Sequence, residues 1–80
     1  ESLDKITEYK DNIRNLSKYL NVLSTRELEI IKMRYGLLNT TQKTQKEIAK
    51  KLHISRSYVS RIEKRALIKM LREFIRNNNI

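Results

Sequence analysis

Apolar residues recur at three- and four-residue steps along most of the chain, which is the spacing of one face of an α-helix. The first such stripe comprises Leu3, Ile6, Ile13, Leu16, Leu20 and Leu23. It predicts one long helix, or two short ones, over roughly residues 2–21. The chain has no proline and a single glycine, so residues that interrupt helices are almost absent. We therefore expect an all-α fold, a small helical bundle.

Capping signals predict the next helix, over residues 25–35. Ser24 and Glu27 have the spacing of a capping box, in which each residue bonds the other's backbone N–H. Gly36 is expected to end the helix, because glycine enters the left-handed conformation without a Cβ clash. A polar loop follows at residues 37–43. The apolar face of this helix is formed by Leu28, Ile31 and Tyr35.

Two more helices are expected in the second half. Thr44 and Glu47 form a second capping box before a short helix. After a turn at His53, Ser55 can cap a long last helix from Arg56 to about Phe74, with residues 77–79 as a fraying end. The inward residues of the short helix are Ile48, Ala49 and Leu52, and those of the long helix are Val59, Ile62, Ala66, Met70 and Phe74, with Leu67 and Leu71 alongside.

The segment from Thr44 to Ile62 has the spacing of a helix-turn-helix. Ala49 is the small residue that lets the second helix cross close to the first. His53 follows four residues later, where the chain must turn sharply. Val59 and Ile62 lock the second helix in place. Unrelated helical hairpins can share this spacing, but it favours a DNA-binding motif whose long recognition helix lies in the major groove.

Polar residues on the outward side of that helix are candidate DNA contacts: Arg56, Ser57, Ser60, Arg61 and Lys64. Arginine can donate two hydrogen bonds to guanine, so Arg56 and Arg61 are the strongest candidates for base reading. Thr44, Gln45 and Lys46 begin the preceding helix, where backbone N–H groups suit a phosphate. Tyr58 either offers its hydroxyl to a phosphate or is a half-buried aromatic.

Charge supports a polyanionic partner. The whole chain has a formal net charge of +9. Residues 1–40 carry 7 basic and 6 acidic groups, whereas residues 41–80 carry 11 basic and 3 acidic groups. The basic half is therefore the half with the helix-turn-helix spacing, as expected for nucleic-acid binding rather than a merely solvated surface.

Composition excludes several kinds of site. The chain has no cysteine and one histidine, so it can build neither a disulfide framework nor a Cys/His zinc site, and we expect no metal and no cofactor. No nucleophile with a base is apparent, so an enzyme is not expected. No apolar run is long enough for a membrane span and no signal peptide is visible, so a cytoplasmic setting is expected.

Glu63 falls near the apolar side of the last helix, and we hypothesise that Arg34 pairs with it.

Three blocks resemble region 4 of bacterial sigma factors, over roughly residues 10–75. They run from Leu23 to Leu37 (LSTRELEIIKMRYGL), from Thr44 to Ala49 (TQKEIA) and from Ser55 to Leu67 (SRSYVSRIEKRAL). The last block is most similar to the sporulation factors sigma-K and sigma-E. The resemblance implies a single domain over residues 1–80. Helices of the region 4.1 type would occupy about residues 10–40, and a region 4.2 helix-turn-helix residues 44–75.

The resemblance also implies a function, recognition of the promoter −35 element in double-stranded DNA by a sigma factor bound to RNA polymerase. The resemblance implies that this factor directs transcription of sporulation-type genes at the bacterial nucleoid. By motif position, bases are read by Arg56, Ser57, Ser60 and Arg61. The DNA backbone is contacted by Arg26, Arg34, Thr44, Gln45, Lys46, Tyr58, Lys64 and Arg65. The resemblance further implies that the flap of the polymerase β subunit docks in an apolar groove, for which Tyr35, Leu67 and Met70 are the candidate residues. An anti-sigma protein is a further candidate partner.

Two other functions remain open from the residues alone. A stand-alone transcription regulator could use the same helix-turn-helix as its DNA-binding output domain, without a polymerase groove. A basic helical bundle for RNA or membrane surfaces would carry similar charge, but its binding would not depend on DNA sequence.

Overall fold

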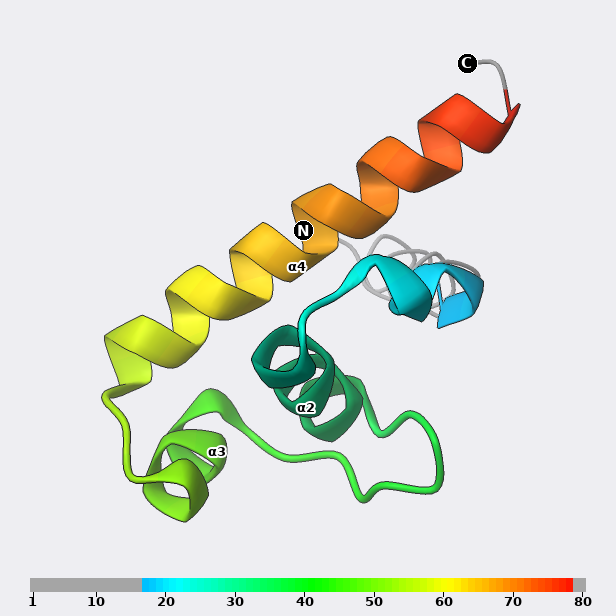
Figure 1. Cartoon of the computed structure of the whole chain (residues 1–80). Coiled ribbons are helices and arrows are strands. Elements are labelled where there is room, and N and C mark those ends of the chain that lie inside the picture. The colour runs from blue at the N-terminus through cyan, green and yellow to red at the C-terminus, as the bar shows by residue number, and fades with distance from the viewer. Residues whose placement is uncertain (1–16, 79–80) are drawn as a thin grey trace, which may run out of the picture.

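The computed structural model describes residues 17–78, all of whose regular elements are helical (Figure 1). A 3₁₀-helix, η1 (Ser17–Val22), is followed by the α-helices α2 (Thr25–Tyr35), α3 (Gln45–Leu52) and α4 (Arg56–Asn78). In Figure 1, α4 is a long rod, and η1, α2 and α3 lie along one side of it. The all-α prediction is confirmed for this part of the chain.

The first predicted helix lies mostly outside the described residues. The part that is described is a 3₁₀-helix with a kink at Tyr19 (φ −100°, ψ 16°). Tyr19 is nearly buried, and its ring meets Phe74 of α4 edge-on with centroids 6.2 Å apart. Packing of this ring against α4 therefore accompanies the break in helical geometry at the kink.

Both capping boxes are confirmed. The N–H groups of Ser24 and Thr44 donate to the carboxylates of Glu27 and Glu47 at 2.9 and 2.8 Å, and both reciprocal bonds are present. Gly36 ends α2 in the left-handed conformation at φ 65°, as predicted. These local interactions define where α2 and α3 begin and where α2 ends.

The core consists of two clusters, one beneath each half of α4. The first joins α2, α3 and the N-terminal half of α4 through Ile30, Met33, Ile48, Ala49, Val59 and Ile62. The second joins η1, α2 and the C-terminal half of α4 through Tyr19, Ile31, Ala66 and Met70. Helix α2 is therefore buried on two sides, which is why Ile30 and Met33, absent from the predicted apolar face, are core residues.

Two expectations for α4 are wrong. Leu71 is 47% exposed, because it lies one residue, about 100° around the helix, beyond buried Met70. The helix also continues past Phe74 to Asn78, so the predicted fraying end begins too early. Glu73 receives side-chain hydrogen bonds from Arg76 and Asn77 over this last turn. Among residues 17–78, no helix is both long and apolar enough to span a membrane.

Candidate nucleic-acid interface

Helices α3 and α4 form the helix-turn-helix that the spacing predicted. Ala49 is buried against the N-terminal half of α4. His53 adopts the left-handed conformation at φ 58°, and its N–H donates to the carbonyl of Ala49. Ser55 then caps α4, since its Oγ accepts from the N–H of Tyr58 at 3.1 Å. Val59 and Ile62 are buried where predicted, so α4 is locked onto α3 and α2.

A polar row along the first half of α4 faces solvent. The predicted base-reading residues, Arg56, Ser57, Ser60 and Arg61, are all exposed, as are Lys64 and Arg65. Tyr58 is 43% exposed, so its side chain is accessible to solvent. The Arg61 guanidinium lies 6.0 Å from the centre of this ring, within the range of a cation–π contact.

The start of α3 presents a second polar end beside this row. Lys46 is exposed, and the capping box occupies the backbone N–H groups of Thr44 and Glu47. The hydrogen bond from the Thr44 backbone, with the one from its side chain, lowers the pKa of Glu47. The capping box does not use the backbone N–H groups of Gln45 and Lys46. These two groups lie at the N-terminal end of α3, where an anion is favoured.

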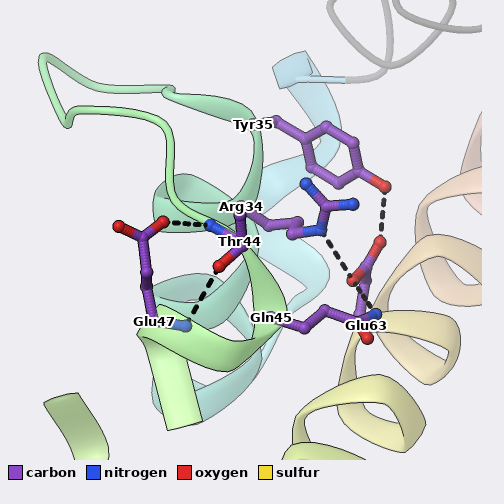
Figure 2. A network of polar contacts seen from close by, with 6 residues as sticks. All are labelled: Arg34, Tyr35, Thr44, Gln45, Glu47 and Glu63. Atoms are coloured by element: carbon purple, nitrogen blue, oxygen red, sulfur yellow. Dashed lines mark hydrogen bonds and ion pairs between the residues drawn. The ribbon is translucent and has the colours of Figure 1, made fainter. Parts of the chain in front are cut away.

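A buried carboxylate joins three helices behind this surface (Figure 2). Glu63 of α4 is 8% exposed and accepts hydrogen bonds from Tyr35 Oη at 2.6 Å and from Gln45 Nε2 at 2.9 Å. Arg34 Nε lies 3.3 Å from its Oε1. The hypothesis that Arg34 pairs with Glu63 is confirmed. The bonds from Tyr35 and Gln45 were missed, because only the tertiary arrangement brings these helices together.

These contacts change how two predicted backbone-binding residues are placed. Arg34 and Gln45 both reach toward Glu63 rather than standing free (Figure 2). The Arg34 side chain is still 31% exposed, but its Nε is buried and makes no hydrogen bond in the structure, because the approach to Glu63 is poorly aligned. Arg26, by contrast, pairs within α2 with Glu29 at 3.7 Å.

A second buried acid, Glu27, was identified from the sequence only as a capping residue. It is 4% exposed and also accepts from Lys69 Nζ of α4 at 2.9 Å. Burial raises the pKa of Glu27, but hydrogen bonds from Lys69 and from the Ser24 backbone outweigh it and lower the pKa below its ordinary value of 4.5. The ends of α2 are therefore both tied to α4 by ion pairs.

The predicted polymerase-groove residues lie at different depths. Tyr35 and Leu67 are half-buried, whereas Met70 has no exposed surface and belongs to the core. Beside Leu67 the surface is hollowed over about 260 Å³. The hollow is lined by Gln45, Ser60, Glu63, Lys64, Leu67, Ile68 and Leu71. Ile68 and Leu71, both well exposed, were not predicted as surface residues of this hollow.

No cluster of three or more potential metal ligands occurs within residues 17–78. The arrangement therefore consists of an exposed polar row on α4, the N-terminal end of α3, and an apolar hollow next to both. Such a surface can bind and orient a polyanion.

Comparison with known proteins agrees with this arrangement. A family model described as Sigma-70, region 4 matches residues 19–72. The chain is 56% identical over 64 residues to the RNA polymerase sigma-28 factor of Bacillus thuringiensis subsp. kurstaki, covering 80% of this chain and 27% of that protein. It is equally similar to the RNA polymerase sigma-K factor of Bacillus subtilis, covering 80% of this chain and 22% of that protein.

The RNA polymerase sigma-E factor of Clostridium acetobutylicum is 48% identical over 54 residues, covering 68% of this chain and 23% of that protein. The resemblance to sigma-K and sigma-E is thereby confirmed, and the chain spans roughly a quarter of the length of these relatives. No solved structure is significantly similar to it. The matched residues cover the helix-turn-helix and the helix before it, and the chain belongs to the sigma-70 region 4 family.

Proposed function

We propose that this domain recognises the −35 element of bacterial promoters as the C-terminal domain of an RNA polymerase sigma factor. One observation carries the proposal: in a region 4 domain, the first half of α4 exposes an uninterrupted polar row on a helix whose opposite side is locked into the core. A recognition helix needs such a row to reach base edges in the major groove. The proposed base-reading residues are Arg56, Ser57, Ser60 and Arg61.

The flanking polar residues would hold the domain on the DNA backbone. Such contacts set orientation and affinity without reading sequence. Lys46 and the two N–H groups at the start of α3 suit one phosphate, and the Tyr58 hydroxyl suits another. Arg34 would use the part of its side chain that remains exposed. The complete proposed backbone set is Arg26, Arg34, Thr44, Gln45, Lys46, Tyr58, Lys64 and Arg65.

The second proposed partner is RNA polymerase, through the flap of its β subunit. The apolar part of the hollow, at Leu67, Ile68 and Leu71, offers the exposed hydrophobic surface that a docked helix requires. Tyr35 would border this contact, and Met70 would support it from the core. An anti-sigma protein that covered the same surface would compete with the flap. Within the cell, the domain would act at the nucleoid on sporulation-type promoters, as the resemblance to sigma-K implies.

The test is binding of the 80-residue chain to a panel of duplexes that carry systematic variants of a −35 hexamer, with and without a peptide of the flap-tip helix. We expect a clear preference among the duplexes and measurable binding of the peptide. A domain tethered to polymerase has a high effective concentration at the promoter, whereas the free domain lacks this advantage and binds DNA more weakly. The binding is therefore measured at low salt, which raises the affinity for DNA. Equal binding to all duplexes would overturn sequence recognition, and absence of peptide binding would favour a stand-alone regulator.

A further inference from the structure

Glu63 lies beneath the proposed DNA surface, and its one carboxylate contacts three side chains from two other helices. Tyr35 and Arg34 come from the last turn of α2, and Gln45 comes from the first turn of α3 (Figure 2). The Tyr35 hydroxyl and the Gln45 amide each donate a hydrogen bond to one of the two carboxylate oxygens, and the Arg34 guanidinium forms an ion pair with the carboxylate, so charges and hydrogen-bond roles are complementary. At 8% exposure, little water competes for these bonds.

A hydrogen bond to Glu63 joins the first turn of α3 to α4. Gln45 is the first residue of α3, directly after the capping residue Thr44. Its side chain donates to Glu63, which lies one helical turn before Leu67 on α4. The backbone N–H groups at the start of α3 and the base-reading row of α4 must face one DNA duplex together. An error of even about 1 Å in this relationship would misalign one set of contacts while the other is made.

We infer that Glu63 is a positioning residue for DNA binding, whose hydrogen bonds to Gln45 and Tyr35 hold the start of α3 at the angle to α4 that lets both helices contact the same duplex. This inference rests on the proposed function. Glu63 itself does not touch DNA. Its contribution is made through the phosphate contacts at the start of α3, which carry no base information.

Electrostatics makes the inference testable, because the two effects of removing Glu63 have opposite signs. Loss of a negative charge from a basic protein strengthens its attraction to DNA. Loss of the positioning bonds weakens binding. Glu63→Met removes both the charge and the bonds while keeping the side chain's length, whereas Glu63→Gln removes the charge and keeps an acceptor for Gln45 and a partner for Tyr35.

The experiment measures fluorescence-anisotropy binding of the 80-residue chain to its preferred −35 duplex and to a scrambled duplex. The variants are Glu63→Met, Glu63→Gln and, as the matched control, Glu73→Met, which removes one charge from the far end of α4. Binding is compared at a temperature where circular dichroism shows every variant folded. A merely stabilising role would change the unfolding temperature and leave the affinity of the folded protein unchanged.

We expect Glu63→Met to bind both duplexes about five- to tenfold more weakly than Glu73→Met, the size of one or two lost hydrogen-bonded contacts. Glu63→Gln should remain within about twofold of Glu73→Met. Equal affinities of Glu63→Met and Glu73→Met would overturn the inference, as would a Glu63→Gln variant as weak as Glu63→Met. If the wild-type chain binds neither duplex, the proposed function itself fails, which is a distinct result.

Tyr35→Phe keeps the test available if Glu63→Met does not fold. It removes one donor from the carboxylate and almost no buried volume. We expect about two- to threefold weaker binding to both duplexes, with the ratio between them unchanged. Binding equal to that of the wild type would overturn the inference.

Discussion

Replacing Lys69 by methionine should destabilise the domain at neutral pH but much less in acid. Lys69 of α4 donates to the Glu27 carboxylate at 2.9 Å, across from the start of α2. The Glu27 side chain is 5% exposed, whereas that of Lys69 is 41% exposed. The substitution leaves a nearly buried charge with its remaining bond from the Ser24 N–H. Methionine preserves most of the apolar stem of lysine.

The magnitude follows from these exposures. A hydrogen bond to a charged group contributes about 1.5–3 kcal/mol, and an exposed ion pair about 0–1 kcal/mol. Because Lys69 is partly solvated, water can replace some of its contact, and we expect a loss of about 1–2 kcal/mol. For a domain of this size the unfolding temperature should fall by about 5–10 °C.

The pH dependence has a definite sign. The folded pKa of Glu27 is below its ordinary value of 4.5, so its ionised form stabilises the fold above that value. This contribution is lost as the pH falls through the lowered folded pKa. The Lys69→Met penalty should therefore be full at neutral pH and should shrink in acid, once the pH has fallen through the lowered folded pKa of Glu27.

Urea unfolding followed by circular dichroism at both pH values measures this difference. Lys64→Met is the control, because it removes an exposed lysine from the same helix without touching Glu27. A penalty for Lys69→Met that was the same at both pH values, or no larger than that of the control, would refute the assigned role of the ion pair.

The remaining predictions concern DNA binding and the turn. Arg61→Ala should reduce the preference for the matched duplex by about 1–3 kcal/mol, since a bidentate base contact is lost; an unchanged ratio of matched to scrambled binding would contradict this. Lys46→Ala should weaken all duplexes alike and reduce the salt slope by about 1, as measured by binding at several salt concentrations. His53→Gly should stabilise the domain by up to about 1 kcal/mol in urea unfolding, because glycine adopts φ 58° without strain; destabilisation would mean that the imidazole makes stabilising contacts.

Local signals predicted the helix boundaries best. The two capping boxes, Gly36 and the His53 turn depend on interactions within four residues, so the sequence contains all the information they need. The end of α4 and the kink at Tyr19 were not predicted. Tyr19 packs across the fold against Phe74, and helical periodicity carries no information about that contact.

The candidate site divides in the same way. The exposed row on α4 follows from helical phase, since Val59 and Ile62 fix which side is buried. The positions of the Arg34 and Gln45 side chains do not follow from helical phase. Motif position assigned both residues to the DNA backbone, but both contact Glu63 in the structure. A polar residue's partner depends on which helices meet, and that is a property of the tertiary structure.

The two buried acids, Glu27 and Glu63, both form ion pairs between α2 and α4. Glu27 at the start of α2 binds Lys69 of α4, and Glu63 of α4 contacts Arg34 at the end of α2. The two ion pairs therefore follow one another in opposite order along α2 and along α4. The acid of one ion pair lies on α2, and the acid of the other lies on α4. If either helix slid by one turn, a carboxylate would lose its partner while still buried, which costs far more than an exposed pair contributes. In a chain with a net charge of +9, these acids thus do more than balance charge, because both ion pairs favour the register in which α2 packs against α4.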